Sequence, residues 1–201
     1  MNRYVIMANG KGMRWQNFTD RPKHLLEIDG ETLLKRCVRL LCEYDPGCEI
    51  IITATDDRYD VDGARRHEPL NNKFEIDRFT YELIDDDVCF LYGDTYYTDA
   101  AIEQIVACSG DGLLFLGNTE RIIAVKVLDG DVMRKHVDRV KGLFLNGELA
   151  DCKGWQVYQS FNGLPFGVKV ILENYVLIED GTRDFNYPDD YLKFMCERGE
   201  L

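Results

Sequence analysis

The sequence predicts an α/β fold, a three-layer doubly wound (Rossmann-like) arrangement around a mostly parallel sheet. The first observation is a set of unbroken apolar runs of strand length at residues 4–8, 49–54 and 88–92. Strands of a parallel sheet are buried on both faces and therefore lack polar alternation. The second observation is helical periodicity between and after these runs. Strands and helices in this order imply right-handed crossovers with helices on both faces of the sheet.

The first elements follow from local signals. Strand 4–8 runs into a glycine loop, and Thr32 is placed to cap a helix that ends at residues 45–47, Asp-Pro-Gly. The apolar positions of this helix recur at helical spacing: Leu33, Leu34, Cys37, Val38, Leu40 and Leu41. Strand 49–54 follows and is rich in isoleucine and threonine, which favour strands.

The third strand is flanked by two predicted helices. Residues 73–84 place Ile76, Phe79, Leu83 and Ile84 on one helical face. Strand 88–92 ends in Gly93-Asp94, and Thr98 can cap the next helix at about 99–107.

The second half has shorter segments. Strand-like runs at 113–116, 121–127 and 154–160 predict a smaller mixed β portion, and two helices, 165–178 and 189–197, are expected to close the chain. We expect a single domain over 1–201, divided into a mostly parallel α/β half at about 1–110 and a mixed half at about 111–201.

Composition limits the class of protein. With 201 residues and 45% apolar composition, one substantial core is expected. A net charge of −12 argues against binding a nucleic-acid backbone. No apolar run approaches a membrane span, and seven scattered cysteines without a C-x-x-C pair indicate reduced thiols in the core rather than a zinc or disulfide framework. The sequence thus predicts a cytoplasmic protein with neither nucleic acid nor membrane as partner.

The N-terminal segment reverses the charge of the rest. Residues 1–25 carry five basic side chains (Arg3, Lys11, Arg14, Arg21 and Lys23) against the single acidic Asp20. Behind strand 4–8, the glycines of Gly10-Lys11-Gly12 let backbone N–H groups approach a phosphate, which Arg14 and Lys23 can neutralise. Because Lys23 follows a proline in a loop, we expect it to face phosphate rather than core. The stretch lacks the third glycine of the dinucleotide fingerprint and the G-K-[ST] ending of a P-loop.

These residues carry a family resemblance. Residues 8–14, Ala-Asn-Gly-Lys-Gly-Met-Arg, followed by Pro22-Lys23, resemble the A-G-G-x-G-T-R-L … P-K signature of sugar-phosphate and related nucleotidyltransferases. Residues 25–33 are similar to that family's L-L-x-I-x-G-x-x-L continuation, and Asn9 stands where the family has glycine or alanine. The resemblance implies two substrates, a nucleoside triphosphate bound by the half at about 1–110 and a small phosphorylated acceptor bound by the half at about 111–201. It also implies nucleotide binding by Ala8, Asn9, Gly10, Lys11 and Gly12, and catalytic roles for Arg14 and Lys23.

Asp94 is the first candidate metal ligand. It lies at the carboxyl end of a central strand, where open α/β sheets bind their ligands. In the family that the sequence resembles, this aspartate binds the metal that bridges the nucleotide phosphates, which implies Mg²⁺, or Mn²⁺ in its place. The alternative is a capping role in the turn that follows.

A second ligand is expected near the C-terminus. Residues 184–191 resemble the D-x-N/D-T-P-E-D-L ending of the molybdopterin-cofactor and cytidylyl branches, where the residue two before the proline often completes the metal site. That residue is Asn186, with Asp184 as the competing ligand, because a carboxylate offsets more of the ion's charge than an amide. We favour Asn186. Asp189 and Asp190 are interpreted as helix-end charges.

Two further groups are assigned by position. Asn71 and Asn72 stand where family members recognise base or ribose, and their amides suit a base edge, although asparagines before a helix are also caps. His24 is expected to extend the phosphate-facing rim, while His67 and His136 are expected on the surface or in packing.

The predicted activity is transfer of a nucleoside monophosphate to a small phosphorylated acceptor with release of pyrophosphate; a homodimer is compatible with the sequence. One alternative is a metal-dependent glycosyltransferase of related fold, although Asp94-Thr95-Tyr96 lacks the second aspartate of a D-x-D motif. The other is a non-catalytic nucleotide sensor, suggested by Asn9 and Asn186.

Overall fold

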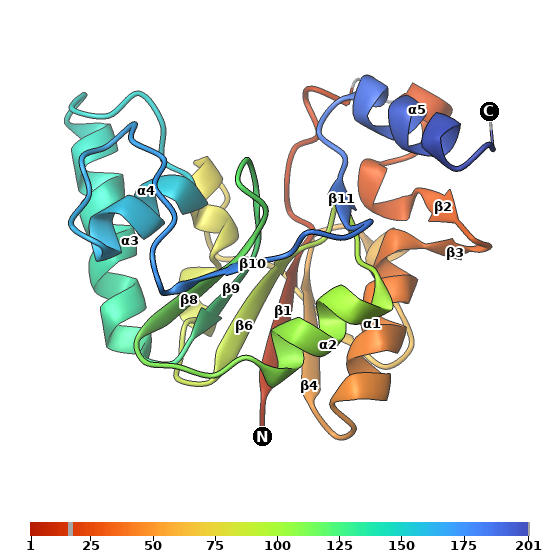
Figure 1. Ribbon diagram of the computed structural model, residues 1–201, viewed down its shortest axis with the longest axis horizontal. Coiled ribbons are helices and arrows are strands. Elements are labelled where there is room, and N and C mark those ends of the chain that lie inside the picture. Colours follow the sequence, from red (N-terminus) through yellow and green to blue (C-terminus); the bar gives the residue numbers. More distant parts are fainter. Residues whose placement is uncertain (16–17, 201) are drawn as a thin grey trace.

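The computed structural model describes residues 1–15 and 18–200, and it has the predicted α/β architecture (Figure 1). Its main sheet has seven strands. From one edge to the other they are β10 (Tyr175–Leu177), β8 (Leu113–Gly117), β9 (Ile122–Val127), β6 (Val88–Tyr92), β1 (Arg3–Met7), β4 (Glu49–Thr53) and β5 (Arg65–His67). Only β9 runs antiparallel to its neighbours β6 and β8. The mixed β portion predicted for the second half is therefore part of the same sheet.

Helices cover both faces of this sheet. On one face lie α1 (Leu33–Tyr44) and α2 (Asp99–Ala107), and on the other lie α3 (Gly130–Leu145) and α4 (Gly154–Phe161) (Figure 1). The predicted caps of α1 and α2 are confirmed, because the Thr32 and Thr98 hydroxyls accept hydrogen bonds from the backbone N–H groups of Lys35 and Ala101. None of the described helices combines the length and the apolar character needed to cross a bilayer.

Smaller elements lie at the carboxyl end of the sheet. Two strand pairs, β2 (Glu27–Ile28) with β3 (Glu31–Thr32) and β7 (Thr95–Tyr96) with β11 (Arg183–Asp184), precede the last helix, α5 (Pro188–Glu197). Short 3-10 turns complete the chain at Phe18–Asp20, Lys23–Leu25, Asp57–Tyr59, Glu75–Arg78 and Tyr81–Leu83.

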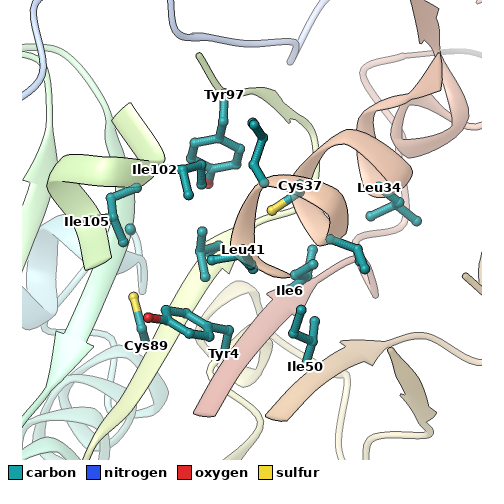
Figure 2. Close-up of a cluster of buried hydrophobic side chains, with 14 of the residues drawn as sticks. Tyr4, Ile6, Leu34, Cys37, Leu41, Ile50, Cys89, Tyr97, Ile102 and Ile105 are labelled. Carbon is teal, nitrogen blue, oxygen red and sulfur yellow. The ribbon is translucent and has the colours of Figure 1, made fainter. Parts of the chain in front are cut away.

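Alternate residues of each central strand enter two different cores. Tyr4, Ile6 and Ile50 face α1 and α2, as Figure 2 shows. Val5 and Phe90 face α3, α4 and the turns at 75–83. The continuous apolar runs of the sequence are explained by this two-sided burial.

A third, smaller core joins the two ends of the chain. It packs Trp15, Leu26 and Leu33 against Phe185 and Phe194 of the C-terminal segment. Aromatic edges meet there, with the Phe185 and Phe194 ring centroids 5.4 Å apart. This core, which we call the terminal core, holds the segment around residue 186 against the loop that follows β1.

The helix predicted at 73–84 is wrong. The Asp77 carboxylate accepts hydrogen bonds from the backbone N–H groups of Lys73 and Phe74 and pairs with Lys141. A side chain that binds nearby backbone in this way competes with helical hydrogen bonding. The segment therefore forms two 3-10 turns, with its apolar residues still buried.

Three further predictions are also wrong. Residues 154–160, expected as a strand, form α4. Residues 165–178, expected as a helix, form no helix. There three backbone groups bond to side chains of α4: the Tyr158 hydroxyl donates to the Val170 carbonyl and accepts from the Leu172 N–H, and the Gln159 amide donates to the Val168 carbonyl. Helix α3 was not predicted, because Asp129-Gly130-Asp131 at its start is also typical of a turn. The third error concerns two cysteines, Cys42 and Cys196, which are exposed rather than in the core.

Candidate active site

The candidate site lies where β1 and β6 end side by side. These strands pair in parallel with Met7 opposite Tyr92, so the loop after β1 and Asp94 after β6 emerge at the same edge. The chain leaves β1 toward β4 on one side and later returns to β6 on the other. Open α/β sheets bind ligands in the crevice at such a switch of direction.

At the centre of this edge, Lys23 forms an ion pair with Asp94, and both are buried. The 3-10 turn Lys23–Leu25, entered from Pro22, carries the lysine inward. Burial alone would raise the pKa of Asp94, but the nearby positive charges of Lys23 and Arg78 outweigh it and hold the pKa below its usual value. The carboxylate is therefore ionised at neutral pH.

A cleft of about 400 Å³ opens above this pair. Seven of the residues predicted for the site line it: Gly10, Lys11, Gly12, Arg14, Lys23, Asn72 and Asn186. Six basic side chains face it (Lys11, Arg14, Lys23, Lys73, Arg78 and Lys153) against the acidic Glu75 and Asp151. In a chain of net charge −12 this is a strong local excess of positive charge. We call it the basic cleft.

A second cavity of about 190 Å³ adjoins the basic cleft, and we call it the acidic cavity. Arg14, Glu75, Arg78, Lys153 and Asn186 line both spaces. The candidate metal ligands Asp94, Asp184 and Asn186 meet at the acidic cavity, whose apolar walls are Tyr92, Ile122 and Trp155.

Backbone hydrogen bonds hold Asp184 and Asn186 beside Asp94. Strand β11 runs antiparallel to β7, and the Phe185 N–H donates to the Asp94 carbonyl over 2.9 Å. Asp184 and Asn186 lie on one side of this extended segment, since the Asn186 amide donates to the Asp184 carboxylate over 2.5 Å. The Asn186 oxygen accepts from Arg14 over 3.1 Å, which links the C-terminal segment to the loop after β1.

Asp184 occupies a less favourable environment than Asp94. Its burial raises the pKa, and the negative charges of Asp94 and Asp190 raise it further, whereas Arg121 at 2.9 Å lowers it. The Asp190 carboxylate is engaged elsewhere, accepting from the N–H groups of Asn186 and Tyr187 at the start of α5. This agrees with its interpretation as a helix-end charge.

Other predicted residues lie outside the two cavities. The Ala8 side chain is in the core. Asn9 is 7% exposed, its carbonyl accepts from the Asn72 amide over 2.7 Å, and its own amide has no partner among the described residues. Asn71 lines a different hollow, formed with α3 residues, so Asn71 and Asn72 are not brought together at one base.

The expectation for His24 is wrong. Its side chain is 3% exposed and lies with ring Nδ1 3.4 Å from the Tyr59 hydroxyl rather than on a rim. Burial lowers its pKa to about 3, so the ring is neutral at physiological pH. His24 therefore adds no charge beside Lys23.

Sequence reasoning missed several basic residues of the site, notably Arg78, Arg121 and Lys153. None belongs to a recognisable motif, and each comes from a segment that only the tertiary fold brings to this edge. Arg78 left one trace in the sequence: a Cβ at Gly10 would lie 3.3 Å from an Arg78 guanidinium nitrogen, so the glycine there makes room for it.

The oxygen set suits a magnesium-like ion. Two carboxylates and one amide from two segments of the chain line one cavity, and oxygen ligands are those that Mg²⁺ prefers. Burial raises the pKa of Asp184, so a nearby positive charge would favour its ionised form. Over residues 1–15 and 18–200, no group of three or more histidine, cysteine, aspartate or glutamate side chains forms a metal site by itself. A metal here would thus rely on Asn186 or on phosphate oxygens as well.

No protein-family model and no curated protein sequence matches the chain. Solved structures do resemble it. A proposed glucose-1-phosphate thymidylyltransferase from Bacillus anthracis, in complex with a sucrose, has a TM-score of 0.65 and 16% identity, over 100% of this chain and 96% of that one.

Two cytidylyltransferases are also similar. The CTP:phosphocholine cytidylyltransferase from Streptococcus pneumoniae has a TM-score of 0.56 and 14% identity, over 98% of this chain and 100% of that one. The inositol-1-phosphate CTP transferase from T. maritima has a TM-score of 0.60 and 15% identity, over 100% and 97%. Identities this low establish shared architecture. The chain therefore has the fold of the sugar-phosphate nucleotidyltransferases and cytidylyltransferases.

Proposed function

We propose that this protein transfers a nucleoside monophosphate from a nucleoside triphosphate to a small phosphorylated acceptor and releases pyrophosphate. The observation that carries the proposal is the adjoining pair of cavities at the ends of β1 and β6, one basic and one lined by the candidate metal ligands. A triphosphate fits the charge of the basic cleft, and the reacting phosphates would meet at the boundary of the two cavities.

In this reaction an acceptor phosphate oxygen attacks the α-phosphorus. A new P–O–P bond forms, the bond from the α-phosphorus to the bridging oxygen breaks, and pyrophosphate leaves with that oxygen. Two anions must approach each other, so positioning and charge neutralisation are the main tasks of the protein. The N–H groups of the loop at 10–12, with Arg14 and Lys23, would hold the triphosphate.

Asp94, with Asn186 or Asp184, would hold Mg²⁺ or Mn²⁺. Such an ion would offset phosphate charge at the site of attack. Arg14 and Asn186 already touch, so the side chains proposed for the phosphate and for the ion form one connected set. No side-chain nucleophile is required.

CTP is our preferred donor. The short chain and the ending at 184–191 resemble the compact cytidylyl branch. The chain also shares its fold, over nearly its whole length, with two CTP-using enzymes. The acidic cavity of about 190 Å³ suits a small acceptor, such as a sugar phosphate or a phosphocholine-like ester.

A pyrophosphate-release screen tests this proposal. The four nucleoside triphosphates would be crossed with sugar 1-phosphates, polyol phosphates and phosphocholine, with Mg²⁺ and with EDTA. We expect metal-dependent pyrophosphate release with one pairing, CTP foremost. Consumption of a nucleotide sugar would instead indicate a glycosyltransferase, and nucleotide binding without turnover would indicate a sensor.

We further predict that Asn186 is a direct metal ligand. Asn186→Asp should preserve or strengthen metal binding, whereas Asn186→Ala should raise the Mg²⁺ concentration for half-maximal rate, because an oxygen ligand is lost. Asp184→Asn should matter less in this titration. The assignment fails if Asp184→Asn proves the more damaging of the two.

A further inference from the structure

The two carboxylates of the acidic cavity each carry their own basic partner. Asp94 pairs with Lys23, and Asp184 pairs with Arg121 at 2.9 Å. Both acids are largely buried, with 8% and 18% of their side chains exposed, so neither could remain ionised without a nearby positive charge.

The two basic partners face different spaces. Lys23 lines the basic cleft but not the acidic cavity. Arg121 lines the acidic cavity and the neighbouring surface hollow around Arg183 and Lys193, but not the basic cleft. Any cation bound between Asp94 and Asp184 would take over the counter-charge of both acids. It would thereby free one basic side chain toward the proposed nucleotide and the other toward the proposed acceptor.

The surroundings of Arg121 allow its guanidinium to turn from Asp184 to a phosphate. Its backbone is fixed, with its N–H donating to the Asn118 side chain and its carbonyl accepting from the Asn118 N–H and the Tyr175 hydroxyl. Its guanidinium forms an ion pair with Asp184, and its side chain is 36% exposed, so the guanidinium can turn without disturbing the main chain. A guanidinium binds phosphate oxygens in a bidentate manner.

We propose that Arg121 binds the phosphate of the acceptor, and that its ion pair with Asp184 prevents this until a divalent cation held by Asp94 and Asn186 supplies the nearby positive charge that Asp184 needs. The inference rests on the proposed function, because it assigns the acidic cavity to a phosphomonoester. It implies an order of events: cation first, then acceptor phosphate. An acceptor would thus not occupy the site before the cation-bound nucleotide is in place.

The two tryptophans give a separate readout for each space. Trp15 lines the basic cleft and donates its indole N–H to the Arg21 carbonyl, whereas Trp155 lines the acidic cavity and donates to the Glu120 carbonyl. Because the chain has only these two tryptophans, its ¹H–¹⁵N spectrum should contain two indole signals, which Trp155→Phe assigns. No turnover is needed for this measurement.

The experiment titrates inorganic phosphate into the whole chain and follows the Trp155 indole signal. Without divalent cation we expect weak binding, and with saturating Mg²⁺ we expect binding to tighten by about 10- to 100-fold, the usual range for a gained charged hydrogen bond. In Asp184→Asn, where Arg121 has lost its charged partner, binding without cation should be about tenfold tighter than in the unaltered protein.

Arg121→Gln should lose the Mg²⁺-dependent gain. Arg183→Gln is the matched control, because Arg183 lies one residue before Asp184 and pairs with Glu197 without lining the acidic cavity. It should behave like the unaltered protein. Since Asp184→Asn and Arg121→Gln move the affinity in opposite directions, loss of structure cannot imitate the expected pattern.

The proposal is overturned if Arg121→Gln binds phosphate as the unaltered protein does, or if Asp184→Asn gains nothing in the absence of cation. The Trp15 signal keeps the proposed function separate. A CTP titration that shifts Trp15 while the Arg121 results fail removes only this inference, whereas the absence of any Trp15 response to all four triphosphates removes the proposed function.

Discussion

Lys23→Ala is expected to lower kcat/KM by about 10²- to 10³-fold, the cost of removing one preorganised charge contact from a buried site. The lysine reaches the floor of the basic cleft from the turn after Pro22, and a triphosphate bound there would receive its charge. Steady-state kinetics with the donor and acceptor found in the pyrophosphate screen measure the effect. A variant with unaltered kcat/KM would remove Lys23 from the mechanism.

The same substitution should also destabilise the fold, contrary to what its position in the sequence suggests. A lysine after a proline in a loop is expected to be exposed, but Lys23 is 5% exposed and its removal leaves Asp94 buried without a partner. Breaking a buried ion pair in this way costs about 3–5 kcal/mol in the free energy of unfolding. The double variant Lys23→Met with Asp94→Asn removes both charges and should recover part of this stability in urea unfolding while activity stays low.

The second large effect is expected for Asp94→Asn compared with Asp189→Asn. Asp94 lines the acidic cavity, whereas Asp189 is exposed in the first turn of α5. Asp94→Asn should raise the Mg²⁺ concentration for half-maximal rate and reduce kcat on the order of 10²-fold, because a carboxylate ligand is lost. Asp189→Asn should change both by less than about twofold, the scale of a surface helix-end charge.

The Mg²⁺ titration is essential to this comparison. Asp94→Asn also leaves Lys23 without its partner, so a fall in rate alone would not distinguish metal binding from loss of structure. The position of the titration curve does distinguish them. If the two variants give the same Mg²⁺ curve, Asp94 is not a ligand.

The elements predicted best are those with signals in their own residues. Strands β1, β4 and β6 are buried on both faces and appear as apolar runs, and Thr32 and Thr98 mark the helix starts. The predictions fail where side chains form hydrogen bonds with the backbone of the segment. Asp77 and Lys141 disrupt the helix expected at 73–84, and Tyr158 and Gln159 bind the non-helical backbone at 168–172.

In the candidate site, too, residues in local motifs could be predicted, whereas partners from distant segments could not. Arg14, Lys23 and Asp94 lie in local motifs, so their proximity could be anticipated from strand ends that share one sheet edge. The partners that set their charge state could not be anticipated. That Asp184 would meet Arg121, 63 positions earlier, depends on the pairing of β11 with β7 and on the β8–β9 hairpin, neither of which has a short-range signal.

The terminal core has a consequence for motion. Because Trp15, Leu26 and Leu33 pack against Phe185 and Phe194 in a core of their own, the two segments that carry them are expected to open and close as one cooperative unit while β1, β4 and β6 stay intact. The hydrogen bond from Arg14 to Asn186 joins the two segments at the edge of the basic cleft. Amide hydrogen exchange in the two segments, more than 150 positions apart along the chain, should therefore slow together when a nucleotide occupies the basic cleft.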